Sequence, residues 1–355
     1  MRVLIIGMGF SGKMFTEAFQ SIASLYSKEI TIAYTSRTKK DIELTYYSNV
    51  KESLEKFNPN IVVIAVNDEN HGEILSMIED YDGFVICEKP FVDPNFDLNS
   101  VGKLLQNVSG FCLHMVARYS NATRLLKTYV EEHGLKLVRA NFLWEKNRIN
   151  DYRPTTGVIS EVIHSLDLVQ WINHNSMLEF KKIQGVKSDF SISGDSIADS
   201  VAIIGEIDGA VITGYSSFVN LFRRRELDFV FLNNDDELIY AQLSFDTPNW
   251  YEDSLNIWKE VSGHKETLLE FNSLLQNYNG ERKIERIVNV VKDVTNFVML
   301  HEEPKYAFPS IEEAIHLQEL LNEINMHTQR FCTVKYNSSE SRVLLTEQSG
   351  FNRLG

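Results

Sequence analysis

The stretch that decides the fold is Val3-Leu4-Ile5-Ile6-Gly7-Met8-Gly9-Phe10-Ser11-Gly12. Four consecutive apolar residues predict a buried strand, and a GxGxxG pattern follows it directly. Residues 13–25 then have the apolar spacing of a helix, so the glycines stand between a strand and a helix. In that context the glycines permit a tight turn, close backbone approach to a pyrophosphate, and packing of helix on strand. A glycine-rich turn without a ligand is the alternative. The expected cofactor-binding residues here are Gly7, Gly9, Phe10, Ser11 and Gly12.

Further buried strands follow along the first third of the chain. Apolar runs without polar alternation stand at residues 30–34, 61–66, 84–87 and 111–116. Such runs are typical of strands that helices cover on both faces. Residues 1–122 are therefore predicted to form a dinucleotide-binding Rossmann domain with a doubly wound parallel sheet, in a protein of the α/β class.

The pattern changes after residue 122. Alternating strand patterns stand at residues 137–144, 200–207, 210–218, 225–232 and 238–245. Asp208-Gly209 is a hairpin signal between two of them, and residues 233–236 mark a second turn. Helical spacing returns at residues 160–172, 265–278, 284–300 and 311–325. We predict an α+β domain over residues 123–330, with a predominantly antiparallel open-faced sheet, and a C-terminal extension over residues 331–355.

Composition restricts the partners. The net charge of −14 argues against nucleic acid or an anionic membrane as the main partner. Cys87, Cys112 and Cys332 are too few and too far apart for a disulfide framework, which fits a reducing cytoplasm. No His/Cys spacing resembles a zinc site, so no metal is expected. No segment approaches the ~18 apolar residues that a membrane span needs.

The end of the second predicted strand should decide which nicotinamide cofactor binds. An NAD site usually has an acid there, whereas this chain has Ser36-Arg37-Thr38 with two lysines following. Hydroxyl groups beside a guanidinium suit the 2′-phosphate of NADP, because arginine binds phosphate bidentately. The alternative is a solvated basic loop. The sequence favours NADP, and NAD remains possible.

Lys89 stands where a buried strand ends in Glu88-Lys89-Pro90. Open α/β sheets bind ligands at this carboxyl edge, so Lys89 is a candidate catalytic group. Its ammonium group would stabilise negative charge on a substrate oxygen, and would also carry a proton if burial lowered its pKa. A salt bridge to Glu88 or to a helix carboxylate is the structural alternative.

These features together resemble the Gfo/Idh/MocA oxidoreductases, named for glucose–fructose oxidoreductase and inositol dehydrogenase, to about residue 328. The motif Cys87-Glu88-Lys89-Pro90 carries most of the resemblance. Residues 116–119 are similar to the family's Arg-Tyr segment, and residues 67–71 to the loop after the fourth strand. Residues 157–171 resemble the helix with the catalytic histidine.

The resemblance implies hydride transfer between a nicotinamide and a hydroxyl or carbonyl carbon of a sugar, polyol or sugar nucleotide. It also implies homodimers or homotetramers that pair through the second-domain sheets. It makes Lys89 and His164 the expected catalytic pair. Further cofactor-binding residues are expected to be Asn67, His71 and Glu88, and substrate-binding residues Arg118, Tyr119, Ser160, Glu161 and Asp167. Packing at the domain hinge is the alternative for Arg118 and Tyr119.

One position departs from the family pattern. An acid usually stands four residues before the histidine, where this chain has Ser160. Glu161 is one step further along the helix and points about 100° away, so it does not simply replace that acid. The departure leaves open an NAD(P)-binding regulatory or scaffold protein with a degenerate site. Residues 223–225, three arginines, are either a solvated strand or a grip for a substrate phosphate.

Overall fold

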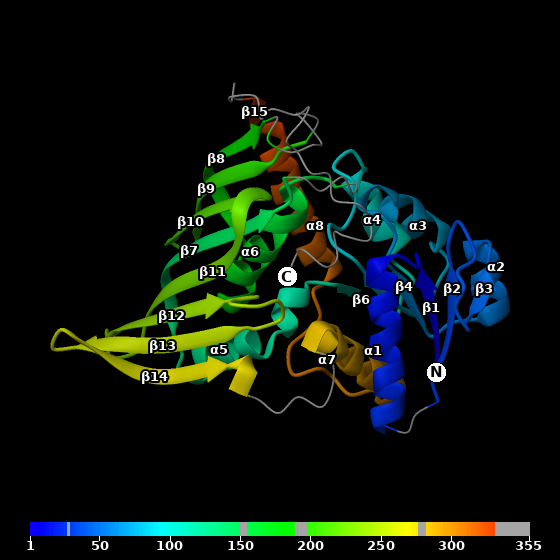
Figure 1. Cartoon of the computed structure of the whole chain (residues 1–355), viewed down its shortest axis with the longest axis horizontal. Coiled ribbons are helices and arrows are strands. Elements are labelled where there is room, and N and C mark those ends of the chain that lie inside the picture. The colour runs from blue at the N-terminus through cyan, green and yellow to red at the C-terminus, as the bar shows by residue number, and fades with distance from the viewer. Residues whose placement is uncertain (27–28, 150–154, 189, 191–196, 276–281, 331–355) are drawn as a thin grey trace. The chain divides into compact units, whose positions relative to one another are not determined.

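The chain forms two compact units, Met1–Tyr119 with Gly280–Glu319 and Ser120–Asn279 with Leu320–Gly355. The computed structural model describes residues 1–26, 29–149, 155–188, 190, 197–275 and 282–330 (Figure 1). The predicted extension over residues 331–355, which contains Cys332, lies outside the described residues.

The first unit contains a parallel six-stranded sheet within the described residues. Its strands are β1 (Arg2–Ile6), β2 (Thr31–Thr35), β3 (Thr45–Tyr47), β4 (Ile61–Ile64), β5 (Phe84–Cys87) and β6 (Gly110–Leu113). Its helices are α1 (Phe10–Tyr26), α2 (Val50–Phe57), α3 (His71–Met77), α4 (Leu98–Leu104), α7 (Glu285–Leu300) and the start of α8 (Ile311–Met326), with short 3-10 helices η1 (Asp68–Asn70), η2 (Val116–Tyr119) and η5 (Arg282–Ile284). Every residue of β1, β4 and β5 except Arg2 is buried, as the unbroken apolar runs predict.

In the strand order β3-β2-β1-β4-β5-β6, successive strands are added to one side of β1 and then, from β4, to its other side. The order therefore reverses between β1 and β4. Doubly wound sheets bind ligands outside the carboxyl ends of the strands at such a point. The glycine loop leaves the sheet there, directly after β1.

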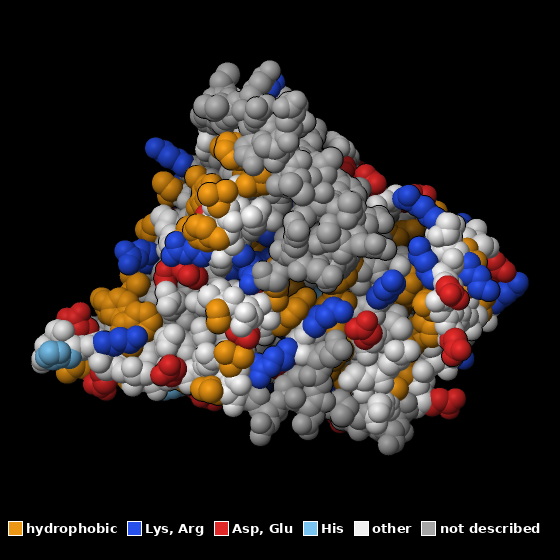
Figure 2. All heavy atoms as spheres, viewed as in Figure 1, with side chains coloured by type: hydrophobic (Ala, Val, Ile, Leu, Met, Phe, Trp, Pro, Cys, Tyr) orange, Lys and Arg blue, Asp and Glu red, His pale blue; other side chains and the backbone are white. Residues whose placement is uncertain are grey.

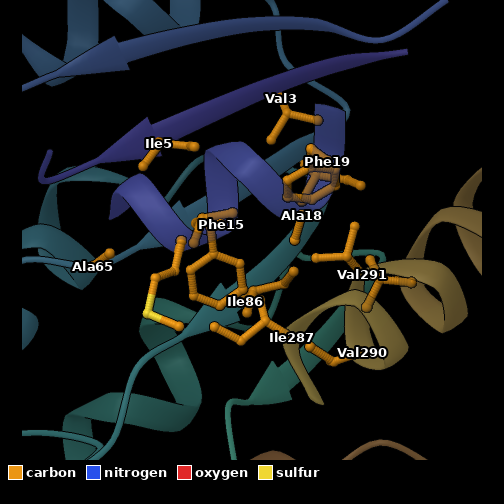
Figure 3. Close-up of a cluster of buried hydrophobic side chains, with 14 of the residues drawn as sticks. Val3, Ile5, Phe15, Ala18, Phe19, Ala65, Ile86, Ile287, Val290 and Val291 are labelled. Atoms are coloured by element: carbon orange, nitrogen blue, oxygen red, sulfur yellow. The ribbon is translucent and has the colours of Figure 1, made fainter. Parts of the chain in front are cut away.

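One hydrophobic core joins the sheet to both α1 and α7. Figure 3 shows Phe15 and Phe19 of α1 close to Ile287 and Val291 of α7, beside Ile86 of β5. The sequence had placed residues 284–319 in the second domain, whereas the structure returns them to the first unit. The apolar face of α7 is buried against α1, which sequence order alone does not indicate.

The second unit contains a mixed, largely antiparallel nine-stranded sheet within the described residues. Its order is β14-β13-β12-β11-β7-β10-β9-β8-β15, with β7–β10 and β8–β15 parallel. The strands are β7 (Lys136–Asn147), β8 (Glu179–Lys187), β9 (Ser200–Ile207), β10 (Ala210–Ser217), β11 (Val219–Leu232), β12 (Leu238–Ser244), β13 (Ser254–Val261), β14 (His264–Asn272) and β15 (Thr328–Arg330). Among its described residues this unit also contains the helices α5 (Asn121–Glu132) and α6 (Ile159–Ile172), the end of α8, and the 3-10 helix η4 (Ser273–Leu275). The predicted fold class is confirmed.

The hairpin signal at Asp208-Gly209 is also confirmed. The two residues join β9 to β10, and their φ angles of 47° and 84° are those that a tight two-residue hairpin requires. The helix predicted over residues 265–278 is wrong in its described part, which is β14 followed by η4. Because β14 is a mostly exposed edge strand, its sequence lacks the alternation that marks a half-buried strand.

The sheet of the second unit has a covered face and an open face. Helix α6 packs against β7 and β10, and every one of its residues is buried. The open face carries apolar side chains such as Ile204, Val211 and Tyr215, which are 39–49% exposed. Figure 2 shows orange hydrophobic side chains reaching the surface over the strands of this unit. No helix among the described residues has the length and hydrophobicity to cross a membrane.

Candidate functional site

The glycine loop has three glycines in three different environments. Gly7 has φ +100°, and a Cβ there would lie 2.5 Å from the Ala65 carbonyl oxygen. A Cβ on Gly12 would lie 2.0 Å from the Gly7 carbonyl oxygen, so only glycine lets α1 start this close to the loop. A Cβ on Gly9 would meet nothing within 4 Å. The turn, the open position and the close packing are the three roles that a dinucleotide loop requires.

A cleft of about 610 Å³ opens beside this loop in the first unit. Gly7 and Gly9 line it together with Ser36, Arg37 and Thr38 after β2. Asn67, after β4, lines it as well. The structure therefore brings together residues that the sequence assigned to cofactor binding from three separate segments. Phe10 is 51% exposed at the start of α1.

The segment after β2 is basic and polar. The Ser36 hydroxyl donates to the Thr38 carbonyl at 2.6 Å, which folds the segment into a tight turn. Arg37 is exposed, and Lys40 also lines the cleft. Among the described lining residues the acid is Glu73, which α3 supplies rather than β2.

Glu88 connects the glycine loop to the ends of two strands. Its Oε1 atom accepts hydrogen bonds from the Ser11 hydroxyl and from Nδ1 of His114, the latter at 3.0 Å. Burial opposes ionisation of this carboxyl, but His114, Ser11 and Lys89 outweigh it and lower the pKa of Glu88 to about 2. The glycine loop is thus fixed to a partly buried carboxylate next to Lys89.

Lys89 is half-buried at the end of β5, and its backbone N–H donates to Oε2 of Glu88 at 3.3 Å. His71 lies close by but is fully buried. Its Nδ1 is 2.8 Å from the Pro90 carbonyl oxygen and its Nε2 is 3.3 Å from that of Val66. His71 therefore supports the segment that carries Lys89, while direct contact with a cofactor stays a prediction.

Arg118 and Tyr119 are buried in the first unit. Arg118 pairs with Glu313 of α8 at 2.9 Å. The Tyr119 hydroxyl lies 3.6 Å from Sγ of Cys112, and its carbonyl oxygen accepts from Asn289 at 2.9 Å. These contacts match the packing role that the sequence left open, and they carry no argument for a substrate role.

Helix α6 of the second unit positions the other predicted residues. His164 is 7% exposed, and its ring lies 5.4 Å from the Trp144 ring, centroid to centroid. Ser160 donates from its hydroxyl to the Gly157 carbonyl at 2.9 Å, in the first turn of the helix. Asp167 is fully buried. At position 160, where the family pattern has an acid, the serine hydroxyl makes a hydrogen bond within the first turn of the helix.

Glu161 belongs to a network that the sequence did not reveal. Its two carboxylate oxygens pair with Lys146 at 2.9 Å and with Arg225 at 3.3 Å. Arg225 also pairs with Asp246. Burial lowers the pKa of Lys146 to about 8, aided by the charges of Arg225 and Arg148 and opposed by Glu161. The partners stand on different strands and a helix, so no sequence spacing marks the group.

Among the described residues, no group of three or more His, Cys, Asp or Glu side chains is placed to hold a metal ion. The first unit therefore has a cleft beside the glycine loop. The second unit has the buried His164 and the charged network of Glu161, Lys146 and Arg225.

Residues 1–113 match the model of the oxidoreductase family GFO_IDH_MocA, described as an NAD-binding Rossmann fold. No curated protein matches the chain. Among solved structures, an NAD-binding oxidoreductase from Klebsiella pneumoniae has 14% identity and a TM-score of 0.73, over 92% of this chain and 96% of that chain. A levoglucosan dehydrogenase in complex with NADH and L-sorbose has 14% identity and a TM-score of 0.70, over 92% and 96%.

A third solved structure is the transcriptional regulator Gal80p from Kluyveromyces lactis. It has 14% identity and a TM-score of 0.71, over 92% of this chain and 89% of that chain. At these identities the likeness establishes the fold of both units. Residues 1–113 therefore match the Rossmann domain of the Gfo/Idh/MocA oxidoreductase family, and both units have the fold of these solved structures.

Proposed function

We propose that the protein is an NADP-dependent oxidoreductase that transfers a hydride between the nicotinamide and a hydroxyl or carbonyl carbon of a sugar, polyol or sugar nucleotide. The observation that carries the proposal is the hydrogen bond from Ser11 to Glu88. It ties the glycine loop to the strand end that bears Lys89, so the candidate catalytic lysine stands beside the cofactor loop within one unit. The fold of levoglucosan dehydrogenase supports a sugar-like substrate by analogy.

The cofactor is proposed to be NADP rather than NAD. Gly7, Gly9 and the N-terminus of α1 would hold the pyrophosphate, and α1 has no acid in its first turn to repel it. Arg37, with Ser36 and Thr38, would hold the 2′-phosphate. When bound, the nicotinamide supplies the hydride chemistry, and the chain supplies binding and proton transfer.

Lys89 and His164 are proposed to serve the same reaction from their two units. The Lys89 ammonium group would stabilise negative charge on the reacting oxygen. His164 would take or return the hydroxyl proton, the task that histidine most often performs near neutral pH. Glu88 is proposed to act indirectly, by fixing the loop and the strand end that flank Lys89.

The test is turnover of a broad panel of sugars, polyols and sugar nucleotides with NADP(H) and NAD(H). We expect activity with at least one class, a preference for NADP(H), and a loss of kcat of at least about 100-fold in both Lys89→Met and His164→Asn. Cofactor affinity should change little in either variant. His133→Asn is the matched control, because His133 is exposed and stacks on Tyr129. Unchanged kcat in Lys89→Met would refute the assigned mechanism.

A regulatory or scaffold function is the second candidate. The observation in its favour is Ser160, whose hydroxyl bonds to the Gly157 carbonyl where the family pattern expects an acid. The fold of the regulator Gal80p shows that this architecture serves such a role elsewhere. Tight binding of NADP(H) without turnover of any panel member would favour this candidate over the enzyme.

The open face of the nine-stranded sheet is proposed as a homo-oligomer interface. Ile204, Val211 and Tyr215 expose apolar surface on adjacent strands, and Tyr240 and Trp258 stack on the same sheet with ring centroids 5.7 Å apart. Contiguous apolar surface of this kind marks association sites. Light scattering should give a dimer or tetramer, and Ile204→Glu should lower the mass.

A further inference from the structure

Two arginines of β11 face the same side of the sheet. Arg223 and Arg225 both lie over the Trp250 ring, with guanidinium-to-centroid distances of 3.9 and 5.3 Å. Arg224 points to the opposite face and pairs with Glu226 at 2.8 Å. The alternation of a strand thus divides the run of three arginines into a pair that shares one aromatic ring and a single residue that does not.

Arg225 is the centre of this group. Its guanidinium pairs with Asp246 and Glu161, and lies 5.0 Å from the centroid of the Trp144 ring. Glu161 also accepts from Lys146. Buried cations are held in this way only when acids and aromatic faces fix them from several directions. Arg225 is accordingly 8% exposed.

The segment after β12 is folded tightly enough to hold Trp250 in place. The Asp246 carboxylate accepts from the Tyr251 backbone N–H at 2.9 Å, and the Asp246 carbonyl accepts from Nε of Arg223 at 3.0 Å. Thr247 and Glu252 close the segment with a backbone hydrogen bond of 3.0 Å. Arg223 and Trp250 are therefore oriented before any ligand arrives.

Three cations lie close together in this group. Lys146 and Arg225 pair with the carboxylates of Glu161 and Asp246, and Nε of Arg223 donates to the Asp246 carbonyl oxygen. The pKa of Lys146 falls to about 8 although Glu161 lies 2.9 Å away. Burial and the charge of Arg225 also lower the pKa of Arg223, with Asp246 opposing. Burial is the largest cause of both shifts, and an added anion would favour the charged forms against it.

We propose that Lys146, Arg223 and Arg225 form a subsite for an oxyanion, a carboxylate or phosphate, carried by the substrate. Guanidinium groups bind both anions through paired N–H donors. The Trp144 ring centroid lies 5.0 Å from the Arg225 guanidinium and 5.4 Å from the centroid of the His164 ring, so Arg225 and His164 are at most about 10 Å apart. A sugar with an anionic substituent is long enough to reach both. The claim that the anion is part of a substrate rests on the proposed function. The claim that the group binds an anion does not depend on that function.

The first experiment measures binding by calorimetry. Inorganic phosphate, glucuronate, glucose 6-phosphate and glucose are titrated into wild type, Arg223→Gln and Arg224→Gln. Arg224→Gln is the matched control, because it removes the same charge one residue away on the other face. We expect at least one anion to bind wild type and Arg224→Gln alike, and to bind Arg223→Gln at least about 10-fold more weakly. Glucose should bind more weakly than its anionic derivatives.

Lys146→Gln is the second variant, in case Arg223→Gln unfolds. It should lower the affinity for the same anion at least severalfold, and thermal unfolding should still show a folded state. Absence of anion binding to wild type would overturn the subsite. Equal binding by Arg223→Gln, Lys146→Gln and Arg224→Gln would overturn it too, because the anion would then bind elsewhere, as in the cofactor cleft.

The second experiment separates this subsite from the proposed function. Rates with NADP⁺ are compared for neutral sugars, their uronic acids and their phosphates. We expect kcat/KM to favour an anionic member by about 10-fold or more, and Arg223→Gln to remove that preference. If an anion binds in a way that depends on Arg223 but no sugar is turned over, the proposed subsite stands and the proposed oxidoreductase function is refuted. Turnover that does not distinguish neutral from anionic sugars would refute the subsite alone.

Discussion

Nδ1 of His114 lies 3.0 Å from Oε1 of Glu88, and the same oxygen accepts the Ser11 hydroxyl. One partly buried carboxylate thus joins the end of β5, the residue after β6 and the glycine loop. The three segments are far apart in sequence, and each carries or flanks a predicted site residue. Loss of the Glu88 charge should therefore affect the stability of the first unit as well as the site.

Glu88→Gln tests that contribution through its pH dependence. The pKa of Glu88 is about 2 in the fold against 4.5 when unperturbed, so ionisation favours the folded state. Its contribution is complete above pH 4.5 and is lost as the pH falls towards 2. At about 1.4 kcal/mol per pKa unit, we expect Glu88→Gln to lower the free energy of unfolding at pH 7 by up to about 3 kcal/mol.

Urea unfolding from pH 7 down to pH 3 measures this effect. The difference between wild type and Glu88→Gln should be largest above pH 5 and become smaller as the solution is acidified. Glu55→Gln is the control, since Glu55 is exposed on α2. A difference that stays constant across this range would show that Glu88 is not held as an ion.

Gly9→Ala tests the cleft without disturbing the fold. A Cβ at this position meets nothing within 4 Å, and Gly9 is not among the glycines with positive φ. We expect thermal stability to stay the same or rise slightly, because alanine restricts the unfolded chain. NADP(H) should bind at least about 10-fold more weakly, because the methyl group occupies the space that a pyrophosphate needs.

Gly102→Ala is the matched control for that substitution. Gly102 lies in α4, and its Cβ would also meet nothing within 4 Å. It should leave cofactor binding unchanged. Fluorescence titration with NADPH compares the two variants, and equal affinities for Gly9→Ala and wild type would show that the dinucleotide does not bind along this loop.

Arg37→Gln tests the choice of cofactor. Arg37 lines the cleft, whereas Lys39 two residues later does not, so Lys39→Gln removes the same charge from the same loop. Arg37→Gln should lower the affinity for NADPH by about 10-fold or more and change the affinity for NADH by no more than about 2-fold. The reason is that only NADPH carries the 2′-phosphate. If the two variants weaken NADPH equally, the effect is long-range attraction and not a phosphate site.

The parts of the fold that sequence predicts are those with local signals. The run Val3-Leu4-Ile5-Ile6, the glycine pattern and the Asp208-Gly209 hairpin each depend on neighbouring residues, and the structure has all three. Helix α7 and strand β14 depend on distant partners instead. The apolar face of α7 is equally compatible with either unit, and β14 has too little buried surface to produce an alternating pattern.

The candidate site follows the same division. Lys89, Glu88 and the glycine loop could be named as candidates because each lies in a compact motif. Lys146 could not, because it pairs with Glu161, 15 residues away, and shares that carboxylate with Arg225, 79 residues away. Arg118 pairs with Glu313 of α8, a contact that its motif does not indicate, and its substrate role stays a prediction.

Lys146 offers a direct measurement of the electrostatics in that network. Its pKa of about 8 lies below the usual 10.5 because burial and nearby arginines disfavour the charged amine. Protonation therefore opposes folding, and this penalty is complete below pH 8 and disappears as the pH rises to 10.5. Competitive acylation followed by peptide mass spectrometry should give a reactivity midpoint near pH 8 for Lys146. Lys56, whose pKa Glu52 raises, should titrate above 10.5.

Two variants should shift that midpoint in opposite directions. Glu161→Gln removes an attractive charge and should lower the pKa of Lys146 further, while Arg225→Gln removes a repulsive one and should raise it. A general loosening of the second unit would instead hydrate the amine and raise the pKa in both variants. Opposite shifts would show that the charges of Glu161 and Arg225 act on Lys146 in addition to burial, and parallel upward shifts would exclude that coupling.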